Sequence, residues 1–255
     1  KGLRLEDVAA YHRDFYGTGE GEIAVVGDFD PVAVKAQLQA LFADWKSPVP
    51  YAPISTHYSD IKARRDSATT PDKPNAVLMA RQNLSLNLTD SDFPALSIAS
   101  SIFGGDPLKA RLADRIRQKE GLSYGVTAAL HADESRMGRD DNGNLTIQAI
   151  GAPQNMGRLE AAVREEYVRL AKDGVTEQEL RDAVASKLAA RRQARAQDQA
   201  VADALTDHLA YDRSMQFEID RDAAYQALTV AQVNAAIRKH FKPESLSVFV
   251  AGDFK

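Results

Sequence analysis

Hydrophobic and polar residues follow two distinct periods along the chain, and these periods predict its strands and helices. Alternation with a period of two, typical of half-buried strands, covers 75–88, 122–130, 145–150 and 246–250. Apolar residues spaced three or four apart, typical of amphipathic helices, cover 31–45, 93–103, 109–120, 159–170 and a long run from 176 to about 211. Without regular strand–helix–strand alternation, this order predicts an α+β fold, with an antiparallel sheet and helices packed on one face.

Short local motifs predict several element boundaries. Thr176 with Glu179, and Thr229 with Gln232, have the spacing of a capping box at a helix start. Gly174 is expected to end the preceding helix in a left-handed conformation. The Asp-Asn-Gly-Asn stretch at 141–144 predicts a hairpin turn. Residues 67–75, which contain two prolines, read as a loose connection.

The chain contains an internal repeat: residues 3–30 align with residues 228–255 at a constant offset of 225 without a gap. Each copy reads as an amphipathic helix, a turn and a short β-rich run ending in Gly-Asp-Phe. The identical pairs are Leu3/Leu228, Val8/Val233, Ala10/Ala235, Arg13/Arg238, Val25/Val250, Gly27/Gly252, Asp28/Asp253 and Phe29/Phe254. We interpret both copies as the closing unit of a domain, although two generic helix–strand units could also look alike.

This repeat and a proline-rich stretch predict three segments. Residues 1–45 would be the closing unit of a preceding, related domain. Residues 46–60 contain Pro48, Pro50 and Pro53 and would form an extended linker, because proline fixes φ and lacks a backbone donor. Residues 61–255 would form a complete α+β domain.

Composition and charge exclude several classes of protein. With 44% hydrophobic and 27% charged residues, the chain can bury a core. Its lack of cysteine excludes disulfides and cysteine nucleophiles. No run of about 18 apolar residues predicts a membrane-spanning helix, and the net charge of −4 argues against a nucleic-acid binder. Lys187, Arg191 and Arg195 share a helical face, which could meet an acidic ligand or simply face solvent.

The histidines and acidic residues do not predict a metal site. No two of the five histidines are four residues apart, the spacing common in helical zinc sites. The string from His131 to Glu134 would need a histidine at 135 to read as the inverted zinc motif, and serine stands there. Asp140, Asn142 and Asn144 lack the glycine and closing glutamate of a calcium loop. We therefore expect neither metal ligands nor catalytic residues in this chain.

The most specific segment runs from Gly104 to Tyr124 and pairs an arginine with a tyrosine. A helix is expected to end at Glu120, with Gly121 as its left-handed cap. Arg117 would lie in the last turn and Tyr124 just after the glycine, where both could donate hydrogen bonds to a peptide carbonyl. Alternatively, Arg117 compensates the helix dipole and Tyr124 packs beside its apolar neighbours. The residues alone leave both interpretations open.

The motifs of this segment resemble a known family. Gly-Gly at 104–105, Ala-Arg-Leu at 110–112 and Arg-x-Lys-Glu-Gly-Leu-x-Tyr at 117–124 are similar to the C-terminal domains of the insulinase/pitrilysin zinc metallopeptidases, which include mitochondrial processing peptidase. Further similarity lies at 5–16, 25–30, 42–45 and 174–180, so the resemblance covers nearly the whole chain. It implies α+β rolls arranged in two halves that close like a clamshell around a peptide.

The resemblance also implies a function and partners. One half of such an enzyme binds zinc through His-x-x-Glu-His and hydrolyses short or unfolded peptides, while the facing half supplies an arginine and a tyrosine, here Arg117 and Tyr124. Since this chain lacks the zinc motif, zinc is expected outside it, either upstream or in a partner subunit. A different possibility is an inert structural or assembly subunit of the same fold. The expected partners are a peptide and the zinc-bearing half, without nucleic acid or membrane; the resemblance favours a periplasmic or secreted location.

We predict that this chain alone binds no zinc and hydrolyses no peptide, because it lacks the ligands that hold the metal. Metal analysis after dialysis against zinc, together with cleavage of an unstructured fluorogenic peptide, would check this. Stoichiometric zinc that supports cleavage would contradict it.

Overall fold

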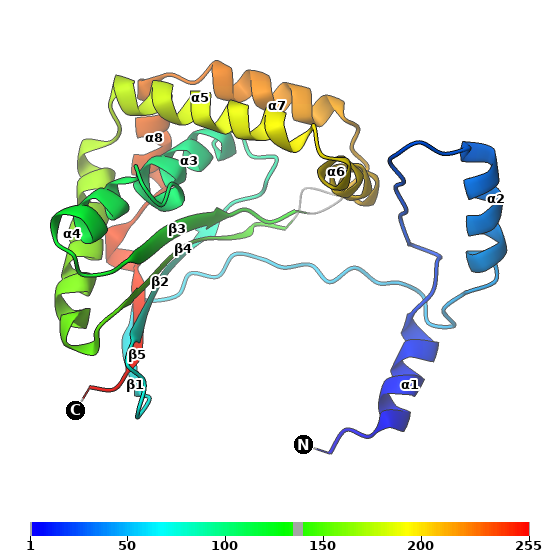
Figure 1. Ribbon diagram of the computed structural model, residues 1–255, viewed down its shortest axis with the longest axis horizontal. Coiled ribbons are helices and arrows are strands. Elements are labelled where there is room, and N and C mark those ends of the chain that lie inside the picture. The colour runs from blue at the N-terminus through cyan, green and yellow to red at the C-terminus, as the bar shows by residue number, and fades with distance from the viewer. Residues whose placement is uncertain (1, 135–139, 255) are drawn as a thin grey trace. The chain divides into compact units, whose positions relative to one another are not determined.

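Five strands form one sheet in the order β1-β5-β2-β4-β3 (Figure 1). The computed structural model describes residues 2–134 and 140–254. The strands are β1 (Arg65–Thr69), β2 (Ala76–Ser85), β3 (Gly125–His131), β4 (Asn142–Gly151) and β5 (Ser247–Gly252). The long central strand β2 pairs antiparallel with both β4 and β5, and β3 pairs antiparallel with β4.

The edge strand β1 departs from the predicted antiparallel sheet, because it pairs parallel to β5. It also corrects the interpretation of 67–75 as a loose connection, since Arg65–Thr69 is a strand. The sequence Arg-Asp-Ser-Ala-Thr has no apolar alternation and four of its five residues are exposed. A strand held by backbone hydrogen bonds at a sheet edge leaves no hydrophobic pattern to detect.

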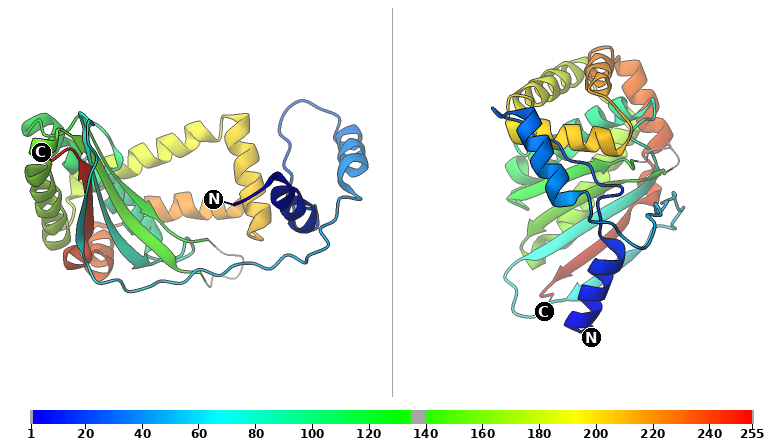
Figure 2. Two further views of the ribbon diagram at one scale, coloured as in Figure 1. Left: turned by 90° about the horizontal axis from the view of Figure 1, so that it is seen from below. Right: turned by 90° about the vertical axis from the view of Figure 1, so that its right-hand side faces the viewer.

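Helices cover one face of this sheet, so the predicted α+β fold is confirmed. The α-helices are α1 (Leu5–Phe15), α2 (Pro31–Phe42), α3 (Phe93–Ser100), α4 (Met156–Asp173), α5 (Glu177–Ala194), α6 (Asp198–Ala210), α7 (Gln216–Gln226) and α8 (Val230–His240). Two π-helices, η1 (Ser101–Gly105) and η2 (Ala113–Lys119), and two short 3-10 turns, η3 (Pro153–Asn155) and η4 (Pro243–Ser245), complete the elements. Buried and exposed residues alternate along β2, and α3, α4 and α8 lie on its buried side (Figures 1 and 2).

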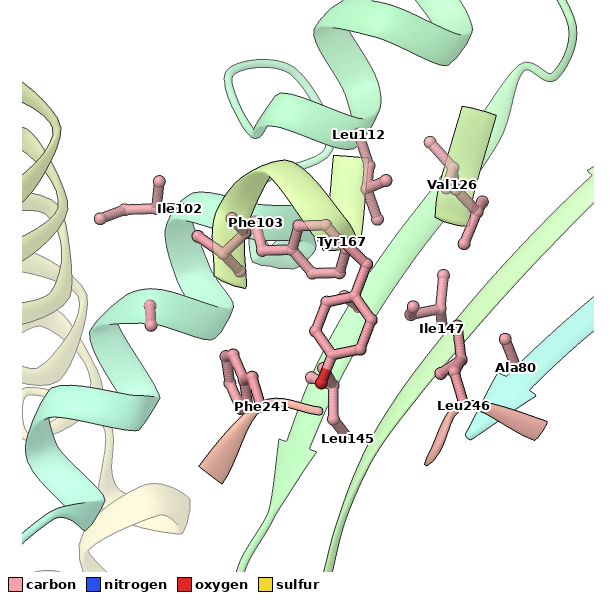
Figure 3. Packing of buried hydrophobic residues seen from close by; sticks show 14 of the residues in the cluster. Ala80, Ile102, Phe103, Leu112, Val126, Leu145, Ile147, Tyr167, Phe241 and Leu246 are labelled. Atoms are coloured by element: carbon pink, nitrogen blue, oxygen red, sulfur yellow. The ribbon is translucent and has the colours of Figure 1, made fainter. Parts of the chain in front are cut away.

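The core between sheet and helices is centred on Tyr167 of α4 (Figure 3). Its ring lies 5.5 Å from that of Phe103 in η1 and 5.8 Å from that of Phe241, which follows α8. The Tyr167 hydroxyl donates to the side-chain oxygen of Gln82 in β2. Burial raises the pKa of Tyr167, which therefore stays a neutral hydrogen-bond donor.

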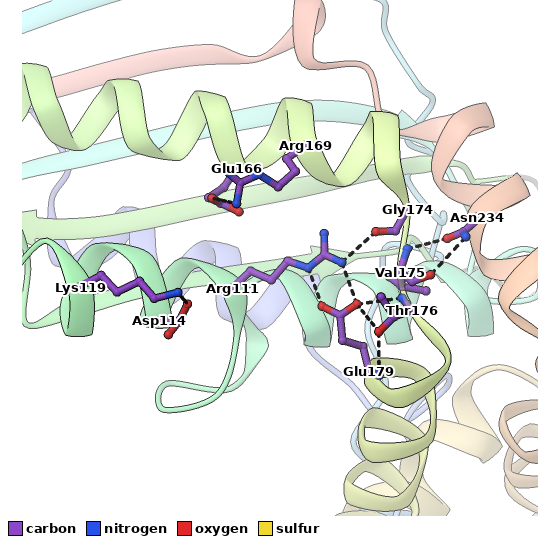
Figure 4. Close-up of polar contacts among 10 residues, drawn as sticks. All are labelled: Arg111, Asp114, Lys119, Glu166, Arg169, Gly174, Val175, Thr176, Glu179 and Asn234. Atoms are coloured by element: carbon purple, nitrogen blue, oxygen red, sulfur yellow. Dashed lines mark hydrogen bonds and ion pairs between the residues drawn. The ribbon is translucent and has the colours of Figure 1, made fainter.

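The predicted helix boundaries at 174–179 are confirmed. Gly174 ends α4 with φ 72°, and the backbone N–H of Thr176 donates to the Glu179 carboxylate at 2.8 Å. Arg111 adds a contact from outside this turn: it donates to both Glu179 oxygens, at 2.7 and 2.8 Å, and to the Gly174 carbonyl at 2.8 Å (Figure 4). The α4–α5 turn is thereby fixed to the segment just before η2.

Two predicted boundaries were wrong. The helical run from 176 does not continue to 211 but ends with α5 at Ala194, and α6 begins at Asp198. Residues 142–144 are not a turn; they lie in β4, where Asn142 pairs with Ser85 and Asn144 with Asn83. Pairing with the long strand β2 outweighs the turn preference of Asn-Gly. Residue 135, where the zinc motif would need a histidine, lies outside the described residues.

The two copies of the repeat form the same helix but differ in burial. α1 and α8 have 11 residues each and start and end at equivalent positions, and the capping box of α8 is confirmed. Val233 is fully buried and Val250 is 2% exposed, whereas the equivalent Val8 and Val25 are 57% and 44% exposed. Residues 22–27, the counterpart of β5, form no strand. The second copy belongs to the unit that contains the sheet, whereas the compact unit of the first copy contains no strand among its described residues.

Two compact units make up the chain: Lys1–Ser55 with Arg191–Glu218, and Thr56–Ala190 with Ile219–Lys255. The second unit contains the whole sheet and its core. The boundaries expected from the sequence, 1–45, 46–60 and 61–255, stay predictions.

The repeat provides a matched pair of substitutions. Val233→Asp is expected to lower the free energy of unfolding by about 3 kcal/mol or more, because it buries a carboxylate without a partner. Val8→Asp, at the equivalent exposed position, is expected to change it by less than about 0.5 kcal/mol. Urea unfolding followed by circular dichroism measures both, and equal losses would contradict the difference in burial.

Glu179 should couple stability to pH. Burial alone would raise its pKa, but hydrogen bonds from Arg111 and Thr176 outweigh burial and keep the pKa below its ordinary value. The stabilisation is therefore present above the unfolded pKa of about 4.3 and is lost as the pH falls through the lower folded pKa. Glu179→Gln is expected to cost about 1–2 kcal/mol at pH 7 and much less at pH 3. The control Glu177→Gln, at an exposed ion pair, should cost little at either pH; a pH-independent loss in Glu179→Gln would contradict the assignment.

Candidate functional site

The candidate site lies on the segment that leads from α3 through both π-helices into β3. In η1, Gly104 approaches β3 so closely that a Cβ there would lie 2.6 Å from both the backbone nitrogen and the Cβ of Ala128. Only glycine permits this contact. The predicted helix 93–103 is α-helical to Ser100 and continues as the π-helix η1 to Gly105, which brings Gly104 against the edge strand β3.

The second predicted helix, 109–120, is also mainly a π-helix. Over η2 the backbone bonds join residues five apart, and the Glu120 N–H donates to the Arg115 carbonyl at 3.0 Å. Ion pairs at the same spacing join Lys119 to Asp114 at 2.6 Å and Arg115 to Glu120 at 2.7 Å. π-helical turns occur frequently at functional sites, and this one carries Arg117.

Arg117 lies on the exposed side of η2. Its Nη1 donates to the Pro107 carbonyl over 3.4 Å, a long and weak hydrogen bond, while the neighbouring Gln118 donates to the Leu108 carbonyl at 2.6 Å. The preceding residue, Ile116, is fully buried. The buried Ile116 therefore fixes the π-helical turn to the core, and the Arg117 guanidinium lies outside the core beside the loop that precedes η2.

Tyr124 follows the left-handed glycine that ends this turn. Gly121 has φ 59°, as its predicted role as a helix cap requires, and the Leu122 N–H reaches back to the Ile116 carbonyl at 2.9 Å. Leu122 is 3% exposed, but Tyr124 is 66% exposed, so its ring adds little to the core. Between them, the Ser123 hydroxyl donates to the Ile150 carbonyl and fixes the start of β3.

Both predicted site residues are therefore surface side chains on opposite sides of Gly121. No hydrogen bond between Arg117 and Tyr124 is present among the residues that the structure describes, and each projects on its own from a fixed backbone. Their roles toward a substrate stay predictions. A guanidinium and a phenol at the surface can each donate a hydrogen bond to a carbonyl or an oxyanion.

The sequence interpretation missed the polar cluster behind η2. Arg115 donates to Glu120, Glu165 and Glu166, the last at 3.3 Å, and only 3% of the Glu166 side chain is exposed. These hydrogen bonds, chiefly those to Glu120 and Glu165, raise the pKa of Arg115. Arg115 and its partners on α4 are about 50 positions apart in the sequence, so no local pattern indicates that they pair. Only the five-residue spacing of Arg115 and Glu120 could have indicated part of this cluster.

A cavity of about 560 Å³ lies between η2 and α4, beside this cluster. Acidic and basic side chains line it in equal numbers: Arg111, Arg115, Lys119 and Arg169 against Asp114, Glu120, Glu166 and Asp173. Figure 4 shows Lys119 turned toward Asp114 and Arg169 toward Glu166. These charges are largely occupied with one another, so the cavity has no excess charge of either sign to select an ion.

The remaining chemical candidates are also engaged or incomplete. Of the three basic residues predicted to share a helical face, Arg191 pairs with Glu218 at 2.6 Å and Lys187 lies 5.8 Å from the ring centre of Tyr225, so these two already have partners within the chain. Within residues 2–134 and 140–254, no group of three histidine or acidic side chains is placed to hold a metal ion. None of the described helices is long and apolar enough to cross a membrane.

Comparison with known proteins identifies the family. Residues 2–187 match the family described as the peptidase M16 inactive domain. A peptidase M16 inactive domain from Pseudomonas fluorescens is 26% identical, with a TM-score of 0.80 over 98% of this chain and 58% of that one. The chain thus spans less than two thirds of that relative. No curated protein matches the chain.

Two further solved structures share the fold at lower identity. A protease from Helicobacter pylori is 17% identical, with a TM-score of 0.78 over 98% of this chain and 59% of that one. The periplasmic protease PqqL from Escherichia coli is 16% identical, with a TM-score of 0.66 over 89% of this chain and 24% of that one. With the family match over most of its length, this chain belongs to the peptidase M16 family and corresponds to its inactive domain.

Proposed function

We propose that this chain is the substrate-facing part, without zinc, of a zinc-dependent peptidase that hydrolyses short or unfolded peptides inside a clamshell chamber. One observation carries the proposal: Arg117 and Tyr124 are exposed at the two ends of a turn whose intervening Leu122 is buried. A rigid backbone that directs two hydrogen-bond donors to the surface suits the recognition of a substrate carbonyl.

The proposed chemistry uses the two donors directly. Arg117 and Tyr124 hold the scissile carbonyl and stabilise the negative charge that grows on its oxygen when water attacks. Both groups act as hydrogen-bond donors, so this stabilisation requires no proton transfer from either side chain. Neither side chain needs to activate water, which is the task of the zinc-bearing part.

Zinc does not fit the residues of this chain. The sequence has no His-x-x-Glu-His, and none of the described side chains form a group of ligands. We therefore assign zinc to another part of the complete enzyme, either in the same polypeptide or in a partner subunit.

The exposed apolar residues in the first copy of the repeat support a second proposal, that a further sheet packs against them. Val8, Ile23 and Val25 are 44–57% exposed, whereas their counterparts, Val233 in α8 and Val248 and Val250 in β5, are at most 2% exposed in the core between sheet and helices. We propose that a sheet comparable to β2–β5, in the remainder of the protein, covers these residues. Exposing three large apolar side chains on one unit would otherwise favour aggregation.

An inert structural or assembly subunit is the alternative, favoured by the missing zinc motif and by the match to an inactive domain. The sequence of the rest of the protein distinguishes the two functions, since an inert subunit would lack His-x-x-Glu-His throughout. For location we propose the periplasm, as in the similarly folded PqqL. Fractionation of cells that express the full protein tests this.

In the complete enzyme, Arg117→Ala is expected to lower kcat/KM by about 100-fold and Tyr124→Phe by about tenfold, because each removes a donor to the oxyanion. Zinc content should not change. Steady-state cleavage of a fluorogenic peptide, with metal analysis of the same samples, measures both effects.

Matched controls are Arg181→Ala and Tyr51→Phe, which alter an arginine and a tyrosine exposed by 61% (side chain) and 68%. They should leave kcat/KM within about twofold, as surface substitutions outside a site do. Unchanged activity in both Arg117→Ala and Tyr124→Phe would reject the proposal, and activity lost together with zinc would reject the assigned roles.

A further inference from the structure

The π-helical register of η2 determines which way Arg117 points. In an α-helix, residues five apart lie about 140° apart around the axis, so their side chains cannot meet. Here Asp114 meets Lys119 at 2.6 Å and Arg115 meets Glu120 at 2.7 Å, each five residues on. The two ion pairs are therefore possible in the π-helical turn and would separate in an α-helical one.

Arg115 is the member of these pairs that reaches beyond the turn. Its side chain is 20% exposed and bridges Glu120, in the same turn, to Glu165 and Glu166 on α4. Lys119, by contrast, is 68% exposed, and its ion pair with Asp114 stays within η2. Because α4 is fixed in the core by Tyr167, Arg115 connects the register of η2 to a rigid element.

The register matters for Arg117 because a shift by one residue rotates a helical side chain by about 100°. Arg117 lies two positions after Arg115, inside the wide turn, and its weak contact with Pro107 over 3.4 Å is too long to hold it alone. If the turn relaxed to an α-helix, the guanidinium would leave the backbone in a different direction while Ile116 was pulled from the core.

We infer that Arg115 is a positioning residue: by bridging Glu120 to α4 it holds the π-turn that directs Arg117 to the substrate carbonyl. The inference rests on the proposed function and deepens it. Arg115 itself touches no substrate. Its effect on the reaction passes entirely through Arg117.

A double-mutant cycle in the complete enzyme tests this. Arg115→Met is expected to lower kcat about tenfold with KM within twofold, because the carbonyl contact matters most in the transition state. In an Arg117→Ala background, Arg115→Met should cause no further loss, since the residue it positions is gone. The control Arg164→Met, at a partly exposed α4 ion pair with Glu160, should change neither value in either background.

Hydrogen exchange gives a second readout that does not depend on activity. The Glu120 amide, bonded to the Arg115 carbonyl, should exchange at least tenfold faster in Arg115→Met but not in Arg164→Met. If Arg115→Met does not fold, Glu120→Gln replaces it as the test. This substitution weakens the Arg115–Glu120 ion pair but leaves the ion pairs between Arg115 and α4 in place. The proposal requires that Glu120→Gln lowers kcat in the wild-type background and causes no further loss in the Arg117→Ala background.

The outcomes separate the two claims. If Arg117→Ala lowers activity but Arg115→Met multiplies that loss, or leaves Glu120 exchange unchanged, the positioning role is overturned and the proposed function stands. If Arg117→Ala has no effect on kcat/KM, the proposed function falls and the positioning role falls with it.

Discussion

A single buried amide joins the layers of this fold. The Gln82 side chain on β2 is 3% exposed; its nitrogen donates to the His240 carbonyl at 2.8 Å, and its oxygen accepts from the Lys242 N–H at 2.9 Å and from the Tyr167 hydroxyl. It thus connects the central strand to α4 and to the end of α8. An unsatisfied polar group here would cost about 1–3 kcal/mol, so the register of these three elements is mutually fixed.

The backbone of the candidate site is held in place through the same group of contacts. Tyr167 packs against Phe103 in η1, and the next residue, Gly104, lies against β3. On the following turns of α3–η2, Arg111 and Arg115 bind the end and the middle of α4. The exposed Arg117 and Tyr124 are therefore carried by a backbone that is held from behind at several points, although neither side chain is itself buried.

How much of this could be predicted depended on whether the determining interactions were local. The capping boxes, the Gly174 and Gly121 caps and the half-buried strands follow from neighbouring residues, and they were predicted. The π-helices, the polar edge strand β1 and the bridge from Arg115 to α4 depend on contacts between distant segments, so no periodicity revealed them. Arg117 and Tyr124 were singled out by family resemblance, since an arginine and a tyrosine seven residues apart carry little information by themselves.

The repeated helices separate two contributions to helix formation that usually act together: hydrogen bonds at the helix ends and packing of the helix side. In α1 the backbone N–H of Arg4 donates to Asp7 at 2.9 Å, as Thr229 donates to Gln232 in α8 at 2.9 Å, yet no residue of α1 is buried. Its ends are thus defined by its own sequence before any lateral packing exists. If the proposed sheet covers α1, the helix joins it with part of its ordering entropy already lost, and the two parts then dock as preformed elements with little refolding where they meet.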